Sequence, residues 1–98
     1  MNIKDFRQQE NGVHEIFLHR WSPRAMSGAD LDEAALLNLF EAARWAPSAN
    51  NNQPWRFIYA RRDTPRWEVF FELLAEGNRI WAKNAAVLIA VISKTTFD

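Results

Sequence analysis

Two arginines and a serine near the amino end of this 98-residue chain have the types and spacing of a phosphate-binding cluster. Arg20 and Arg24 stand four positions apart, with Trp21 and Ser22 between them. Guanidinium groups bind phosphate oxygens through paired, charge-assisted hydrogen bonds, and a serine hydroxyl adds a further donor. Two solvated arginines at a helix end would have the same spacing, so these residues alone leave both interpretations open.

Side-chain amides fill a second candidate segment, the loop over residues 47–54. Three consecutive asparagines are followed there by Gln53. Each carboxamide is both a donor and an acceptor, which suits a heterocycle edge with alternating carbonyl and ring N–H groups, such as the pyrimidine edge of a flavin. Asparagine is also common in turns for backbone reasons, so an ordinary turn is the alternative.

A third candidate is the segment over residues 78–84, where polar side chains surround Trp81. Asn78 opens this segment, and an apolar run follows it directly. A cofactor contact and a plain helix end, with the tryptophan packed into the core, both fit this pattern.

Other chemistries find little support. The chain has no cysteine, which removes disulfides and thiolate sites. His14 and His19 stand five positions apart, out of register for one metal in a helix or a strand, so we predict no metal site. The three glycines are scattered and form no glycine-rich phosphate loop, which argues against a Rossmann-type NAD domain.

Charge and composition narrow the class of protein. Twelve basic and twelve acidic residues balance, so no global field favours nucleic acid or a membrane surface. The longest apolar run, residues 85–92, is far shorter than the roughly 20 residues that span a bilayer. We therefore predict a soluble, cytoplasmic protein. Five tryptophans and seven phenylalanines predict a genuine core or a large interface.

The elements that would position the candidate residues follow from the apolar pattern. Residues 1–12 are polar and end in a turn dipeptide, which predicts a flexible arm. A short helix is predicted over residues 13–20. Residues 30–46 form the clearest helix, with Asp30 and Glu33 in a capping-box pattern. Its predicted apolar stripe is Leu31, Ala35, Leu39, Ala42 and Ala46, widened by Leu36, Phe40 and Ala43.

The second half of the chain predicts two strands separated by helices. Alternating aromatic residues indicate a strand over residues 55–60. A helix is expected from Pro65 to a stop at Gly77, with a further helical turn over residues 78–84. The continuous apolar run over residues 85–92 is typical of a strand covered on both faces. The rings on one side of the first strand would be those of Trp55, Phe57 and Tyr59.

This order predicts an α+β fold in which helices flank a central sheet. Residues 13–98 would form one domain, because the chain is too short for two. Two strands make an incomplete sheet. We therefore expect the sheet to be truncated after its second strand, and either more chain or a partner to complete it.

In this order the segments resemble the nitroreductase family. The family motif Arg-x-Ser-x-Arg is similar to residues 20–24, and the family loop Ala-Pro-Ser-x-x-Asn-x-Gln-Pro-Trp is similar to residues 46–55. Residues 56–60 match the strand after that loop, and residues 78–92 match the Asn-containing segment and the next central strand. The resemblance covers about residues 13–94. It corresponds to the N-terminal half of a family member, and the loop is its most specific part.

The resemblance implies a homodimer that binds FMN at the subunit interface. Such a protein passes hydride from NADH or NADPH through the flavin to nitroaromatics, quinones or other small acceptors. No side chain is implied as an acid or a base, so we nominate no catalytic residue. Carried over by position, the cofactor-binding residues are Arg20, Trp21, Ser22 and Arg24 at the FMN phosphate and ribityl end, Ser48, Ala49 and Asn51 from the other subunit, Gln53 as support for the loop, and Asn78 at the flavin.

Two departures from the family pattern matter. Trp81 stands where some relatives have a flavin-contacting lysine. Family members are also longer, and their second half supplies a backbone donor near flavin N5 and a further basic phosphate contact. Two other hypotheses therefore stay open: a non-catalytic, oligomerising remnant that no longer binds flavin productively, and a small binding module for an unrelated anion.

Overall fold

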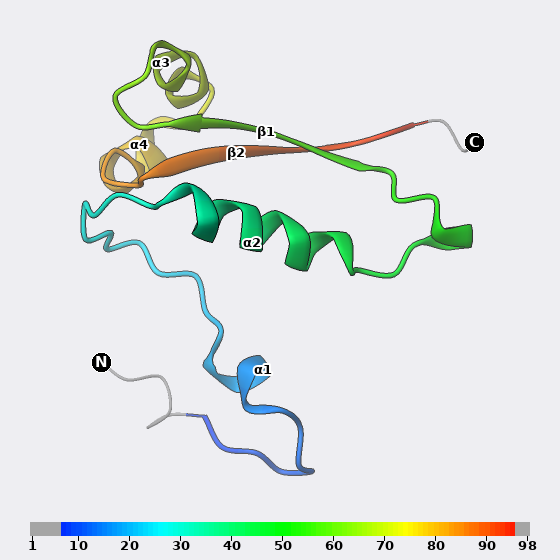
Figure 1. Ribbon diagram of the computed structural model, residues 1–98. Coiled ribbons are helices and arrows are strands. Elements are labelled where there is room, and N and C mark those ends of the chain that lie inside the picture. Colours follow the sequence, from blue (N-terminus) through cyan, green and yellow to red (C-terminus); the bar gives the residue numbers. More distant parts are fainter. Residues whose placement is uncertain (1–6, 96–98) are drawn as a thin grey trace.

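The computed structural model describes residues 7–95 and shows helices packed on an antiparallel pair of strands (Figure 1). Both the α+β class and the predicted order of helices and strands are confirmed. The elements are α1 (Glu15–His19), α2 (Glu33–Arg44), the 3-10 turn η2 (Ala49–Asn51), β1 (Trp55–Arg61), α3 (Pro65–Glu72), α4 (Glu76–Ala82) and β2 (Val87–Ser93).

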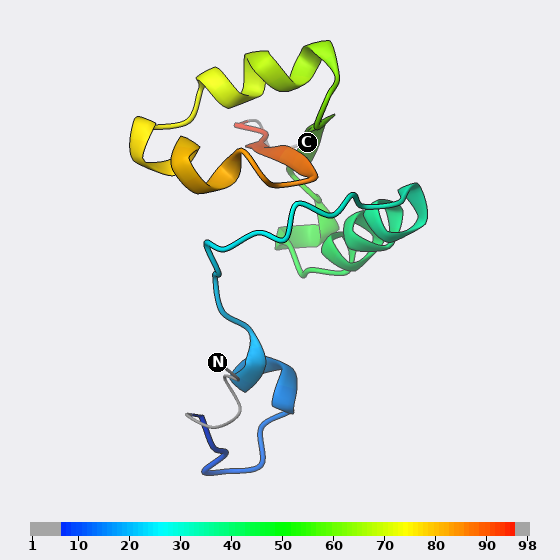
Figure 2. The ribbon, with the colours of Figure 1, turned by 90° about the vertical axis from the view of Figure 1, so that its left-hand side faces the viewer.

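The sheet of the described residues consists of β1 and β2, paired antiparallel. Trp55 lies opposite Ser93 at one end of the pair, and Arg61 lies opposite Val87 at the other. The two views show α2 on one side of the strands and α3 on the other (Figures 1 and 2). The strand pair is therefore the middle layer of a three-layer arrangement.

A small core lies on each side of the strands. On the α2 side, Leu36 is buried, and the ring of Phe40 lies 5.3 Å from that of Phe57 and 5.6 Å from that of Tyr59. On the α3 side, Trp67 is buried and stacks on Phe71 at 6.1 Å. A fully buried aromatic side chain buries on the order of 150–250 Å². Trp67, at 6% exposed, is close to that limit, whereas Tyr59 is 39% exposed.

The start of α2 differs from the sequence prediction. Asp32, not Asp30, caps the helix, and its Oδ1 accepts a hydrogen bond from the amide of Ala35 at 2.7 Å. The capping-box prediction for Asp30 was wrong because that carboxylate pairs instead with Arg62, at 2.7 Å. The predicted apolar face of α2 is correct for Leu36, which is buried, but wrong for Leu39, which is 51% exposed.

Two predictions in the second half of the chain were also wrong. Gly77 does not stop a helix: α3 ends at Glu72, and Gly77 lies inside α4. The apolar run of β2 is not covered on both faces, because Val91 is 69% exposed. Within residues 7–95, β2 has β1 as its single neighbouring strand.

The segment that contains α1 extends away from the rest of the molecule (Figures 1 and 2). The Cα radius of gyration is 16.4 Å, whereas a compact chain of about 100 residues would have about 13 Å. The predicted arm over residues 1–12 lies partly outside the described residues, and its described part has no helix or strand. No described helix has the length and apolar character that crossing a bilayer requires.

Candidate functional site

The arginine cluster lies on the exposed strand-like segment that follows α1. α1 ends at His19, and Arg20 adopts an extended backbone conformation. The guanidinium of Arg20 donates to the hydroxyl of Ser22 at 3.4 Å. Arg24 has no hydrogen bond or ion pair within residues 7–95, and Trp21 is 42% exposed. The cluster therefore presents its donors to solvent.

Two local contacts hold α1, the helix that precedes this cluster. At its start, the Nδ1 atom of His14 accepts a hydrogen bond from the amide of Ile16 at 3.1 Å, so this histidine is a helix cap. At its end, the guanidinium of Arg7 donates to the carbonyl of Arg20 at 2.7 Å. No group of three or more possible metal ligands occurs in the described part of the chain.

The amide loop is closed by its own hydrogen bonds. The hydroxyl of Ser48 accepts from the amide of Gln53 at 3.0 Å, and the Gln53 side chain donates to the Asn51 carboxamide at 3.2 Å. The amide of Asn51 also donates to the carbonyl of Ser48, at 3.1 Å. Ala49 begins the 3-10 turn inside this closed loop. Ser48 and Gln53 therefore fix the path of the backbone.

The backbone of this loop is strained. Asn50, Asn51 and Gln53 have φ values of 52°, 54° and 48°. The left-handed region costs a non-glycine residue roughly 1–2 kcal/mol, and asparagine tolerates it better than most because of its short polar side chain. This explains why the loop is rich in asparagine. Strained residues cluster at binding sites, because the surrounding structure must hold them in place.

Within one copy of the chain, the three groups of predicted site residues do not meet. The amide loop precedes Trp55 at one end of the strand pair, whereas Asn78 lies in α4 near the other end (Figure 1). Seven residues of β1 separate these ends, a span of roughly 20 Å at about 3.3 Å per residue. The Arg20 cluster lies apart from both, on the segment that extends from the body.

A pocket of about 410 Å³ lies beside the amide loop, between the end of α2 and the start of β1. Gln53 is the one predicted site residue that lines it. The sequence did not single out its two arginines, although Arg44 stands one helical turn after Phe40 and so points to the same side of α2. The lining residues are Phe40, Arg44, Gln53, Trp55, Arg56, Phe57 and Tyr59.

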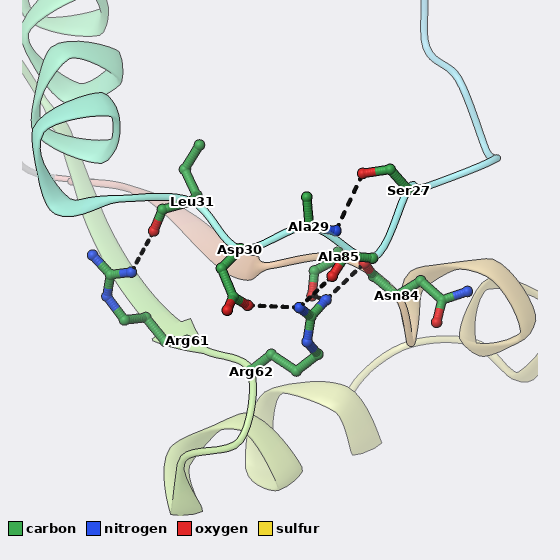
Figure 3. A network of polar contacts seen from close by, with 9 residues as sticks. Ser27, Ala29, Asp30, Leu31, Arg61, Arg62, Asn84 and Ala85 are labelled. Atoms are coloured by element: carbon green, nitrogen blue, oxygen red, sulfur yellow. Dashed lines mark hydrogen bonds and ion pairs between the residues drawn. The ribbon is translucent and has the colours of Figure 1, made fainter.

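Arg61 and Arg62 form a polar network that the sequence did not predict (Figure 3). The side chain of Arg62 is 18% exposed, and it donates to the carbonyls of Gly28, Asn84 and Ala85 and to Asp30. Arg61 donates to the carbonyl of Leu31 at 2.7 Å. Together they fasten the segment before α2 to the turn before β2.

Comparison with known proteins identifies relatives of this chain. The model of the nitroreductase family matches residues 18–91. A Streptomyces coelicolor protein that carries the name NADH dehydrogenase/NAD(P)H nitroreductase is 42% identical over 71 residues, which cover 70% of this chain and 34% of that protein. A Bacillus subtilis protein named as an NAD(P)H nitroreductase is 32% identical over 56 residues, covering 57% of this chain and 29% of that protein.

Two solved structures share the fold. One, described as an oxidoreductase containing FMN, superposes with a TM-score of 0.83 at 56% identity and covers 89% of this chain and 44% of its own. The other, a nitroreductase in complex with FMN from Desulfovibrio desulfuricans, has a TM-score of 0.71 at 32% identity and covers 85% of this chain and 47% of its own. This chain thus spans between 29% and 47% of the length of these four proteins.

Proposed function

Because this chain belongs to the nitroreductase family, we propose that it contributes to an FMN-dependent oxidoreductase. The proposed reaction passes hydride from NADH or NADPH, through the flavin, to a nitroaromatic, a quinone or a similar small acceptor. The names of the relatives support the pyridine nucleotide, and the two solved structures support the flavin.

This proposal rests on hydrogen-bond donors that have no partner among the described residues, in the Arg20 cluster and in the amide loop. Arg24 has no hydrogen bond or ion pair among the described residues, and neither Asn50 nor Asn52 makes a side-chain hydrogen bond there. Guanidinium and hydroxyl groups fit the terminal phosphate of FMN, and carboxamides fit the pyrimidine edge of its ring system. The donor set of this chain therefore fits the cofactor.

We propose that two copies of the chain assemble each site. The Arg20 cluster and the amide loop lie apart in one copy, so one copy would hold the phosphate while its partner offers the loop (Figure 2). Asn78 would approach the flavin from a third direction. A homodimer brings such groups together without any change in the fold of either copy.

The protein groups in this proposal bind and orient, and they carry no proton. FMN supplies the redox chemistry when it is bound. Arg20, Ser22 and Arg24 would fix the phosphate, while Trp21 would lie along the ribityl chain. The strained loop from Ser48 to Gln53 would hold its amides in one fixed direction, which lowers the entropic cost of binding.

A flavin titration tests the proposal. Adding purified protein to FMN should quench the flavin fluorescence, because the ring system becomes stacked against protein. Arg24→Gln should weaken this binding about tenfold or more, since a charge-assisted contact contributes about 1.5–3 kcal/mol. Arg66→Gln is the matched control, because Arg66 is exposed on α3 and far in sequence from both segments. Absence of quenching at a large molar excess of protein over FMN would refute flavin binding, and binding of phosphate without FMN would favour the anion-binding module.

A second candidate function, a non-catalytic oligomerising protein, is favoured by the exposed apolar surface of β2. Val91 is 69% exposed and Ile92 is 43% exposed, and both lie on a strand with an unpaired edge in the described region. Such edges pair readily with another chain. Size-exclusion chromatography with and without FMN separates the two candidates, since an oligomer that forms without flavin and binds none supports the second.

A further inference from the structure

The pocket between α2 and β1 has an aromatic wall. The ring of Phe40 stacks on that of Phe57 at 5.3 Å with an interplanar angle of 30°, and it lies 5.6 Å from the ring of Tyr59. Trp55 completes the set of rings around the pocket. Four aromatic side chains around one opening offer flat apolar surface to a planar ligand, because rings attract one another in stacked and tilted arrangements.

The charge of this pocket is positive. Its lining contains two arginines, Arg44 and Arg56, and no acidic residue. The whole chain has a formal net charge of zero, so the positive charge is local and is not part of a global field. Low-dielectric walls strengthen such a local potential toward an anion.

Both guanidinium groups retain donors for a ligand. Arg56 uses one nitrogen, Nη1, to donate to the carbonyls of Gln53 and Trp55 at 2.9 and 2.8 Å. Its Nη2 and Nε atoms make no hydrogen bond within the described residues, and the two carbonyl contacts fix the direction of the group. Arg44 lies 5.8 Å from the ring centroid of Trp45 and has no ion pair in residues 7–95.

From this combination we infer that the pocket binds a planar aromatic carboxylate, at a site that borders the amide loop at Gln53 and contains none of the other proposed flavin-binding residues. The rings of Phe40, Phe57 and Tyr59 would contact the aromatic plane. Arg44 and Arg56 would bind the carboxylate through charge-assisted hydrogen bonds. The volume of about 410 Å³ lies in the range of roughly 300–1,000 Å³ that is usual for small-molecule sites.

The lining argues against simpler ligands. An inorganic anion would use the two arginines but leave the aromatic wall uncovered. An uncharged aromatic compound or an aliphatic chain would leave two guanidinium groups beside it without an anionic partner. The charge-assisted hydrogen bonds of these groups would then not form. A ligand that is both flat and anionic uses the aromatic rings and both arginines.

Calorimetric titration with 2-naphthoate tests this inference directly. We expect saturable binding with one site per chain. The uncharged analogue 2-naphthalenemethanol has the same ring system without the carboxylate, and we expect it to bind at least tenfold more weakly. Equal affinity for the two compounds would overturn the inference, because the arginines would then contribute nothing.

Three variants locate the site. Arg44→Gln and Arg56→Gln should each weaken 2-naphthoate binding about tenfold and leave the binding of 2-naphthalenemethanol unchanged. Arg66→Gln is the control, since it removes an exposed arginine that does not line this pocket, and it should bind 2-naphthoate like the unchanged protein. Urea-unfolding midpoints within experimental error of one another would show that the variants are folded. Unchanged 2-naphthoate affinity in both pocket variants would overturn the inference.

A competition experiment separates this site from the proposed flavin site. The affinity for 2-naphthoate should be the same with and without FMN. Displacement of 2-naphthoate by FMN would overturn the inference, because the pocket would then belong to the flavin site. Since 2-naphthoate is titrated without flavin, failure of the proposed flavoenzyme function would leave this result intact, and failure here would leave the flavin titration intact.

Discussion

The two segments that carry the candidate cofactor contacts are held in different ways. The amide loop closes on itself through Ser48 and Gln53 and continues directly into β1, so its geometry belongs to the fold. The Arg20 cluster has one side-chain contact of its own, at 3.4 Å, and its backbone is held by Arg7 from the preceding segment. The loop is therefore prepared in a single copy, whereas the cluster depends on what binds it.

The largest expected effect comes from the core on the α2 side of the strands. Leu36 is 1% exposed, so Leu36→Ala should lower the free energy of unfolding by about 3 kcal/mol through lost burial and the cavity that remains. Leu37→Ala is the control, since Leu37 is 58% exposed on the same helix and should change stability far less. Urea unfolding measures both. Equal losses would mean that α2 does not pack as the structure shows.

The next effect concerns the Arg62 network, which fastens the segment before α2 to the turn before β2. Arg62→Ala should lower the free energy of unfolding by about 2 kcal/mol, because the carbonyls of Gly28, Asn84 and Ala85 lose a largely buried donor. Asp30→Asn should cost less than about 0.5 kcal/mol, since the Asp30 side chain is 88% exposed and its ion pair is screened by water. Hydrogen exchange at Ala29 should accelerate in the first variant alone. A larger effect in Asp30→Asn would show that the ion pair, and not the carbonyl contacts, holds the segment.

A smaller effect is expected inside the amide loop. Ser48→Ala removes the acceptor for the amide of Gln53 and should cost about 1 kcal/mol. Gln53→Gly in the same background should recover part of this loss, since glycine adopts a φ of 48° without strain. Urea unfolding of the single and double variants measures the recovery. Gln53→Gly also removes the side-chain hydrogen bond to Asn51, which contributes about 1 kcal/mol. A double variant less stable than Ser48→Ala by more than this amount would contradict the strained conformation.

The smallest effect on stability is expected in the arginine cluster. Arg24→Gln should change the free energy of unfolding by less than about 0.5 kcal/mol, as is usual for an exposed residue without partners. Combining this measurement with the flavin titration shows whether the Arg20 cluster, unlike the amide loop, acts in binding without contributing to stability. A variant of unchanged stability and weakened FMN binding would assign Arg24 to binding alone, whereas a loss of stability above about 1 kcal/mol would show a structural role.

Local patterns predicted the elements of this protein well where neighbouring residues decide them. The helices and strands occur in the predicted order, and Phe57 and Tyr59 both contact Phe40, on one face of β1 as their alternation indicated. The cap prediction failed because a residue distant in the sequence binds the predicted capping group. Asp30 has the residue type of a helix cap, but Arg62, 32 positions away, takes its carboxylate. The Gly77 prediction failed locally instead, since α3 ends at Glu72 and Gly77 lies inside the next helix, α4.

The sequence by itself determined the family, the amide loop and the arginine cluster, because each depends on residue types at fixed short spacings. Only the tertiary structure decided that these segments lie apart within one copy, and that Arg44 and Arg56 meet four aromatic rings in one pocket. Spacing along a chain fixes distances over a few residues. Distances over longer separations depend on how helices pack on strands, and this packing follows from burial summed over the whole fold.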